Sequence, residues 1–280
     1  MVVLVTGCGS GFGRLTALEL ARQGHRVYAG LRNPDAAAAL ADEGTAAARD
    51  GGSLTVVALD VTNASQREAV VAQILDEAGC IDVLVNNAGV ALGGFLESVD
   101  EDEFRAVLDT NVLGAWAMTC AVLPAMRVRR TGRVVMVSSM SGRIGLPGVG
   151  VYAASKWALE GMSESWRHEL ALFGIQVILV EPAQFKTDIF ARNRRVSRRA
   201  AEPGAPWTPY AEHLDRVVSG MVARSAGDPQ RVADLIAALV VHPRPRLRYP
   251  IGPNARLREL LGRYVPFALT ERWMARWLRP

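Results

Sequence analysis

A tyrosine and a lysine, Tyr152 and Lys156, are four residues apart in a stretch with helical periodicity. In a helix, that spacing puts both side chains on one face. A free tyrosine has a pKa of about 10 and is a poor base at neutral pH, but a nearby ammonium favours the phenolate and lowers that pKa. Such a tyrosine can give a proton to a developing alkoxide or take one from an alcohol. Alone, the pattern is equally typical of a solvated pair.

Two serines, Ser138 and Ser139, end the apolar run that precedes this stretch. Open α/β sheets bind ligands at the carboxyl ends of their strands, so a hydroxyl here is a candidate partner for a substrate oxygen. Lysine suits the place beside the tyrosine because it is a compact charge that also hydrogen-bonds ribose hydroxyls.

A glycine-rich turn follows the first apolar run, Val2–Val5, and holds Gly7, Gly11 and Gly13. Glycines let the backbone approach a ligand closely, and the free N–H groups of the following helix favour a pyrophosphate. The spacing is not the strict G-x-G-x-x-G, so a plain turn is the alternative. Its position after the first strand of a β/α series favours a dinucleotide site.

Arg32 follows the second strand at the point where an enzyme selective for NAD(H) usually has an acid. A guanidinium there can pair with a 2′-phosphate, so we expect NADP(H) rather than NAD(H). The alternatives are that Arg32 is an ordinary surface arginine, or that Asp35 binds a ribose.

Short β-branched runs alternate with longer helical patterns along the chain. The alternation predicts one doubly wound Rossmann-type α/β domain over 1–280, with a parallel sheet of about seven strands and helices on both faces. A C-terminal helical substrate lid is also expected, but only from the resemblance described below. We divide the domain into a cofactor and catalytic core (1–190), a substrate loop with helices (191–245), and a last strand with an amphipathic tail (246–280). The expected strands are 2–5, 26–29, 54–59, 83–85, 134–137, 176–180 and 246–249. Residues 192–209 have the least core-like composition and are expected to form a mobile surface loop.

The basic residues are unevenly distributed: only Lys156 and Lys186 are lysines among 32, and the others are arginines. Segments 192–199 and 244–280 hold 14 arginines against two glutamates, and the rest of the chain has an acidic balance. That pattern does not favour a nucleic-acid binder. Three scattered cysteines without metal spacing predict reduced thiols in the cytoplasm and no metal site. No apolar run is long enough for a membrane helix, and no signal peptide is expected.

With these motifs in order, the chain resembles the classical short-chain dehydrogenase/reductase family from about residue 2 to 190. The motifs are Thr6-Gly7-x-x-x-Gly11-x-Gly13, Asp60-Val61, Asn86-Asn87-Ala88-Gly89, Asn111, Ser139, Tyr152-x-x-x-Lys156, and Pro182 with Thr187. Ser139 precedes Tyr152 by 13 residues, which is the spacing of the family. Phe12 and Ala183 replace the usual isoleucine and glycine, and Ser10 is not basic, so only one of two NADP(H) marks is present.

The resemblance implies a role for each of these residues. Tyr152 would be the general acid/base, Lys156 would lower its pKa and hold the nicotinamide ribose, Ser139 would bind the substrate oxygen, and Asn111 would hold a water linking Lys156 to a proton relay. The implied cofactor contacts are Gly7, Ser10, Gly11, Phe12, Gly13, Arg32, Asp60, Val61, Asn87, Ala88, Gly89, Tyr152, Lys156, Pro182 and Thr187. The family also implies a homodimer or homotetramer packed through helices near 112–129 and 151–173.

Within the family, the nearest resemblance is to steroid, retinol and bulky-ketone enzymes, which implies a lipophilic carbonyl or alcohol substrate. Apolar residues expected at the substrate pocket are Met140, Leu146, Val149, Phe185, Ile189 and Phe190. The arginines of 192–199 are either a solvated face or an anion site for a ketone bound to CoA or to a carrier protein. The tail is either a packing helix or a basic amphipathic helix at a membrane surface. A cofactor-binding module without catalysis also stays open.

Overall fold

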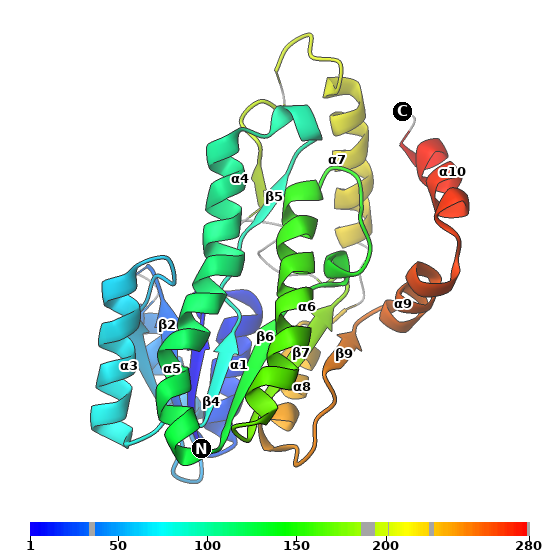
Figure 1. Cartoon of the computed structure of the whole chain (residues 1–280). Helices are drawn as coiled ribbons and strands as arrows, with labels where there is room; N and C mark the ends of the chain where they lie inside the picture. Colours follow the sequence, from blue (N-terminus) through cyan, green and yellow to red (C-terminus); the bar gives the residue numbers. More distant parts are fainter. Residues whose placement is uncertain (34–36, 186–193, 201, 224–226, 279–280) are drawn as a thin grey trace.

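A computed structural model describes residues 1–33, 37–185, 194–200, 202–223 and 227–278. Its centre is a seven-stranded parallel sheet in the order β3-β2-β1-β4-β6-β7-β9 (Figure 1). The strands are β1 Val2–Thr6, β2 Arg26–Leu31, β3 Ser53–Ala58, β4 Val83–Asn86, β6 Gly132–Val137, β7 Ile175–Pro182 and β9 Arg248–Ile251. The predicted doubly wound parallel sheet is confirmed, with strand order reversing between β1 and β4.

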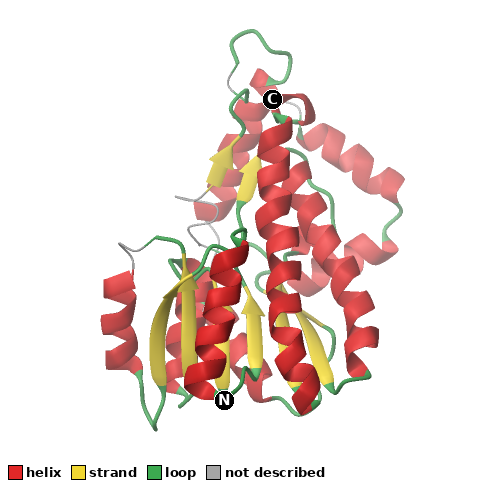
Figure 2. Cartoon of the chain, turned by 60° about the vertical axis from the view of Figure 1, so that its left-hand side comes forward, coloured by secondary structure: helices red, strands yellow, loops and turns green. Residues whose placement is uncertain are grey.

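Helices cover both faces of this sheet (Figure 2). The helices of the described residues are α1 Gly11–Arg22, α2 Ala37–Ala47, α3 Ala64–Ala78, α4 Glu101–Leu108, α5 Ala115–Arg129, α6 Gly150–Ala171, α7 Thr208–Ala223, α8 Gln230–Val241, α9 Ala255–Tyr264 and α10 Phe267–Trp277, and not all of them lie on the sheet. Successive side chains of a strand point to opposite faces. Val3 and Val5 therefore pack in the core under α1 and α8, whereas Leu4 packs with Ile74 and Met118 of α3 and α5.

A second, two-stranded sheet joins distant parts of the chain. Strand β5 Ala91–Gly93 pairs in parallel with β8 Arg194–Val196. Ser98 and Ser197 extend this contact with a 2.8 Å hydrogen bond between their hydroxyls. The segment 192–209 was expected to be a mobile surface loop. Three of its described residues, Arg194–Val196, instead form a paired strand, because their backbone groups hydrogen-bond with those of β5.

The stretch Glu101–Arg129 is one continuous helix in which Asp109–Gly114 is a π-helical turn. By length and mean hydropathy (1.4) this helix could cross a membrane, whereas we expected no such run. Its α5 part packs on β4 and β6, as helices do that cover one face of a parallel sheet. The π-helical turn places Asn111 in the interior.

Helix α7 lies over the loop that precedes α6. Leu214 of α7 is buried, and its side chain fills the space where a Cβ on Gly148 would lie. Gly148 has a φ of +72°, a conformation that favours glycine. The lid-like position expected for the C-terminal helices is therefore observed for α7. The tail continues as α9 and α10 beyond β9 (Figure 1).

Candidate active site

Four polar residues predicted from the sequence converge at the carboxyl ends of β4 and β6. Tyr152 and Lys156 lie in the first two turns of α6, Ser139 follows β6, and Asn111 comes from the π-helical turn. All four are buried, with 1–8% of their surface exposed. Burial removes competing water, so hydrogen bonds and charges act strongly here.

The Tyr152 and Ser139 side chains hydrogen-bond to each other, which tends to lower the pKa of the phenol. Burial outweighs this effect and raises the pKa of Tyr152 to about 12. The protein's own groups therefore do not produce the lowered tyrosine pKa that the sequence suggested. They instead hold the phenol as a proton donor at neutral pH.

The Lys156 ammonium explains that difference. Its Nζ lies 5.7 Å from the centre of the Tyr152 ring and donates a 2.9 Å hydrogen bond to the Val137 carbonyl oxygen. Burial lowers the pKa of Lys156 to about 8, although the neighbouring Glu160 carboxylate acts in the opposite direction. The ammonium is thus oriented by the end of β6 rather than by the phenol oxygen.

Asn111 ties the loop after β4 to α6. Its amide nitrogen donates to the Val90 carbonyl oxygen at 2.9 Å and to Ser155 Oγ at 3.0 Å, and its Oδ1 accepts from the Val90 N–H at 2.8 Å. Both amide hydrogens are therefore used. A water on this side chain, as the family role implies, would have to donate to Oδ1. A Cβ at Gly89 would lie 3.3 Å from that oxygen and 3.8 Å from Lys156 Nζ, so both groups face Gly89.

The glycine turn is fastened to the end of β4 by side chains. Asn87 donates to the carbonyl oxygens of Thr6 (2.9 Å) and Gly7 (3.1 Å), and the Thr6 hydroxyl accepts from the N–H groups of Asn87 and Ala88. A Cβ at Gly7 would lie 2.7 Å from the Ala88 Cα, and one at Gly13 would overlap Gly7 and Asn87. Asn87 and Ala88 thus pack against the glycine turn and fix its backbone conformation.

The start of α1 closes the turn. Ser10 is the residue before the helix, Gly11 has a φ of +57°, and Phe12 packs edge-on against Phe185 with 5.6 Å between ring centres. The N–H groups of this helix end point to the carboxyl edge of the sheet, where an anionic phosphate is favoured.

The expected adenosine end contains Arg32, Asp60 and Val61. Burial raises the pKa of Asp60, but hydrogen bonds from Thr62 and the nearby Arg32 and Arg67 outweigh this, so the pKa is lowered overall. Val61 is buried against Gly114 of the π-helical turn. Arg32 and Arg195 line one hollow of about 220 Å³, together with Thr62, Val90, Ala106, Asp109 and Thr110. Arg195 was not singled out from the sequence because its position follows from the β5–β8 pairing alone.

The expected substrate residues are not all brought together. Met140 is buried just after Ser139, Leu146 is 39% exposed, and Val149 precedes α6. Phe185 was expected at the pocket, but it is a core residue with 1% of its surface exposed. It packs against Phe12 and against the backbone of Gly252. Pro182 is buried at the end of β7; Thr187, Ile189, Phe190, Lys186 and Arg192 lie outside the described residues.

Two arginines of the 192–199 segment have partners within the chain. Arg198 forms ion pairs with Asp100 (3.0 Å) and Asp102 (2.6 Å), and these acids raise its pKa. Arg199 pairs with Glu202 at 3.0 Å and lies over the Trp207 ring. Arg198 therefore holds its segment on α4, whereas Arg199 bonds to residues of its own segment, and neither guanidinium group is arranged as an anion site.

A buried charge cluster lies next to Lys156, and no local pattern in the sequence indicates it. Glu181 is fully buried at the end of β7 and contacts Glu160, one turn after Lys156. Arg143 reaches Glu181 at 3.4 Å, and Arg248 reaches Glu160 and Glu181 at 3.1 and 3.5 Å. Burial, then repulsion from Glu160, raises the pKa of Glu181 to about 8. The positive charges of Arg143 and Arg248 act against this rise in the pKa but do not outweigh it.

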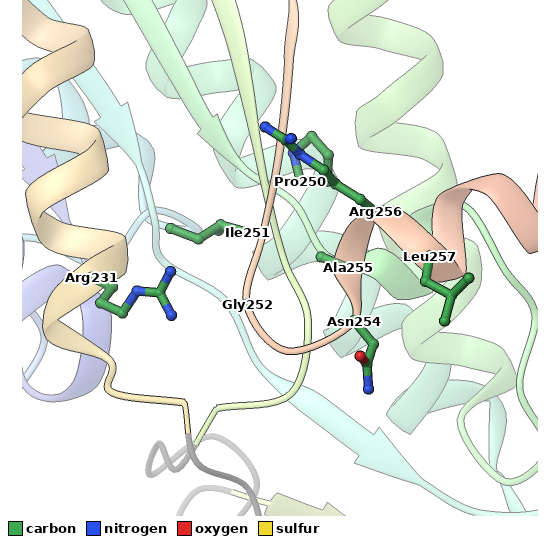
Figure 3. A pocket seen from close by; sticks show the side chains of 8 residues that line it. All are labelled: Arg231, Pro250, Ile251, Gly252, Asn254, Ala255, Arg256 and Leu257. Atoms are coloured by element: carbon green, nitrogen blue, oxygen red, sulfur yellow. The ribbon is translucent and has the colours of Figure 1, made fainter.

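A further hollow of about 340 Å³ lies between α8, β9 and α9 (Figure 3). Its lining residues are Arg231, Pro250, Ile251, Gly252, Asn254, Ala255, Arg256 and Leu257. Arg231 points its guanidinium toward the turn at Gly252 (Figure 3). None of the four catalytic candidates lines this hollow.

Comparisons with known proteins agree with this arrangement. Residues 1–197 match the family model for short chain dehydrogenase. A 3-ketodihydrosphingosine reductase from Bacteroides thetaiotaomicron is 34% identical over 275 residues, covering 98% of this chain and 93% of that protein. A 17-beta-hydroxysteroid dehydrogenase type 1 from Mus musculus is 37% identical over 269 residues, covering 92% and 76%.

Solved structures show the same fold. A short-chain dehydrogenase from Streptomyces avermitilis superimposes with a TM-score of 0.82 at 33% identity, covering 97% of this chain and 95% of that one. Other solved neighbours are complexes with NAD and with NADP. The ordered motifs, the sheet topology and these matches together establish that the chain belongs to the short-chain dehydrogenase/reductase family of oxidoreductases.

Proposed function

We propose that the protein is an NADP(H)-dependent oxidoreductase that interconverts a carbonyl and a secondary alcohol on a lipophilic substrate. The observation that carries the proposal is the buried contact of Tyr152 with Ser139, with the Lys156 ammonium beneath the tyrosine ring. Two hydroxyls within hydrogen-bond distance can exchange their mutual bond for two bonds, so that both donate to a carbonyl oxygen placed between them. A preorganised pair of donors stabilises the negative charge that grows on such an oxygen.

The residues at the carboxyl edge of the sheet fit a dinucleotide. The glycine turn leaves no room for a side chain at Gly7 or Gly13, which is the shape needed for a pyrophosphate to approach the backbone. The hollow lined by Arg32 and Arg195 supports binding of a 2′-phosphate. Asp60 and Val61 would hold the adenine end, and Lys156 and Thr187 the nicotinamide end. When bound, the nicotinamide supplies or accepts the hydride.

The protein's own part in the reaction is to hold and move a proton. At neutral pH, Tyr152 is protonated and can donate to the oxygen of a ketone as it becomes an alkoxide. In the opposite direction it must receive a proton from the alcohol. Ser139 orients the substrate oxygen. Asn111 hydrogen-bonds with Val90 and Ser155, and so fixes the loop after β4 against α6 beside Lys156.

For the substrate class, the named relatives support a bulky ketone, since one acts on a hydroxysteroid and another is a 3-ketodihydrosphingosine reductase. The buried Met140 beside Ser139 and the lid position of Leu214 support an apolar environment. A ketone bound to CoA or a carrier protein is less well supported, because Arg198 and Arg199 are paired within the chain. The complete set of four polar residues also argues against a cofactor-binding module without catalysis.

Assembly and compartment extend the proposal. Trp116 on α5 and Trp157 on α6 are about half exposed, at 48% and 53%, and with Leu113 they supply an apolar surface for a homodimer or homotetramer. The cysteines Cys8, Cys80 and Cys120 are free, which supports a reducing, cytoplasmic compartment. Light scattering would test the oligomeric state, and cell fractionation would test the compartment.

A substrate panel tests the main proposal. Purified protein is assayed with NADPH and with NADH against steroid ketones, long-chain 3-keto lipids and short ketones, following absorbance of the reduced cofactor. We expect turnover of lipophilic ketones with NADPH preferred. Activity confined to short ketones, or a clear preference for NADH, would contradict the substrate or the cofactor assignment respectively.

A further inference from the structure

Helix α9 is attached to the body by its small and polar side. Ala255 is buried, a Cβ at Gly262 would lie 3.0 Å from the Ile144 side chain, and Glu259 reaches Arg143 at 3.9 Å. These three positions lie on one side of the helix, because they are separated by four, three and seven residues. A surface helix normally buries its apolar stripe instead.

The apolar side of α9 faces outward as a result. Leu257, Leu260, Leu261 and Tyr264 are 54%, 53%, 45% and 69% exposed. Their spacing of one, three and four residues makes a continuous stripe on the side opposite Ala255. This orientation means that the apolar stripe does not contribute to the core of the protein.

Helix α10 also exposes apolar side chains. Phe267, Leu269 and Trp273 are 78%, 57% and 61% exposed, and Trp273 stacks on Trp277 with 6.3 Å between ring centres. The end of the helix is held to α7 by a 3.2 Å hydrogen bond between His213 and the Trp277 carbonyl oxygen. Figure 1 shows α9 and α10 at the margin of the molecule, outside the layers that cover the sheet.

Positive charge flanks this apolar surface. Arg256, Arg272 and Arg276 are exposed, and in the described part of the chain no ion pair involves them or Arg258. Arg256 also lines the hollow at the base of α9, opposite Arg231 (Figure 3). Apolar residues flanked by arginines, with indole rings at the border, match the boundary between acyl chains and anionic headgroups.

From these observations we infer that the outward faces of α9 and α10 are a docking surface for an anionic lipid bilayer. A second copy of the chain fits less well, because a two-fold contact through the same patch would bring its arginines against one another. The surface adjoins the catalytic loop, since α9 contacts the turn Met140–Gly142 that follows Ser139. Docking would therefore hold the active site next to the phase in which a lipophilic ketone is dissolved.

The test is binding of the full chain to vesicles of phosphatidylcholine alone or with phosphatidylserine, measured by co-sedimentation. We expect binding to the anionic vesicles, weakening with added salt because surface charges are screened. Trp273→Asp and the double variant Arg272→Glu, Arg276→Glu should each weaken binding by about tenfold or more. Leu96→Asp, at a 91% exposed apolar position away from α9 and α10, is the matched control and should bind normally.

Three outcomes would overturn the inference: no binding to anionic vesicles, binding that Trp273→Asp leaves unchanged, or a dimer in solution that Trp273→Asp dissociates. Thermal melts of each variant exclude loss of folding as the cause. Because vesicle binding is measured without turnover, it can fail while the proposed oxidoreductase activity stands. Conversely, binding without turnover of any ketone would refute only the proposed function.

Discussion

The Lys156 ammonium lies 5.7 Å from the centre of the Tyr152 ring and is held there by the carbonyl oxygen of Val137. The ammonium thus faces the tyrosine ring, while the phenol hydroxyl hydrogen-bonds with Ser139. The positive charge of Lys156 and the proton-donating hydroxyl of Tyr152 therefore have different hydrogen-bond partners. It also makes the two residues separable by mutation.

Replacement of Tyr152 by phenylalanine removes the proton donor and preserves the ring over Lys156. We expect kcat to fall by about 10²- to 10⁴-fold, the range for loss of a general acid/base. NADPH affinity, measured by fluorescence titration, should change little. Turnover close to that of the unmodified protein would show that another group transfers the proton.

Replacement of Lys156 by arginine tests why this position is a lysine in an arginine-rich chain. A planar, bulkier guanidinium cannot occupy the buried space below Tyr152 and donate to Val137 with the same geometry. We expect kcat/KM to fall by about tenfold or more, comparable to a small misplacement of catalytic groups. Arg49→Lys, at an exposed position, is the control exchange between the same residue types. Equal activity for Lys156→Arg would show that any cation suffices.

The two arginines of the adenosine hollow predict a cofactor preference. Arg32→Ala and Arg195→Ala should each raise KM for NADPH by about tenfold or more, the scale of a lost charged hydrogen bond, and leave KM for NADH nearly unchanged. Arg49→Ala serves as the control. A proportional loss with both cofactors would mean that these side chains do not distinguish the 2′-phosphate.

The glycine turn can be tested with two alanines. Gly13→Ala would press a methyl group against Gly7 and Asn87, so we expect destabilisation by about 1–3 kcal/mol, as for overpacking. Gly9→Ala meets no atom within 4 Å and should leave the free energy of unfolding almost unchanged. Urea denaturation of both variants measures the difference. Equal stabilities would refute the close packing of the turn.

The buried Glu181 predicts a pH dependence of stability. In the folded protein it keeps its proton up to about pH 8, whereas an unperturbed glutamate releases it near pH 4.5. The free energy of unfolding therefore loses a contribution as the pH rises from 4.5 to 8. Glu181→Gln should make that decrease smaller, whereas Glu169→Gln, at an exposed position on α6, should not. The measurement is urea denaturation between pH 5 and about 8. If the free energy of unfolding of both variants changed with pH as it does in the unmodified protein, the prediction would be wrong.

The sequence was sufficient for the seven strands of the main sheet, because buried parallel strands are short apolar runs. It also predicted which polar residues follow these strands, and their catalytic role stays a prediction. It did not reveal the β5–β8 pairing, since two three-residue strands about 100 positions apart have no periodicity to recognise. It placed Phe185 in the substrate pocket because an aromatic residue after a strand fits a pocket and a core equally well. Only the contact with Phe12 distinguishes the two.

The direction of the Tyr152 pKa shift was also beyond the sequence. The spacing of Tyr152 and Lys156 predicts proximity, but the balance between burial and charge depends on where the ammonium points. The outward orientation of the α9 apolar stripe also depends on tertiary packing, which the sequence pattern does not contain. A helical wheel identifies the stripe, whereas its orientation depends on the packing of Ala255 and Gly262.

Arg143 compensates two acids at once, Glu181 inside the protein and Glu259 on α9, at 3.4 and 3.9 Å. Any displacement of α9 changes how this single cation is shared, because a departing Glu259 leaves Arg143 to Glu181 alone. A stronger pairing with Arg143 favours the ionised form of Glu181. A displacement of α9 would therefore alter the charge balance at Glu181, a buried carboxyl that contacts Glu160, one helical turn after Lys156.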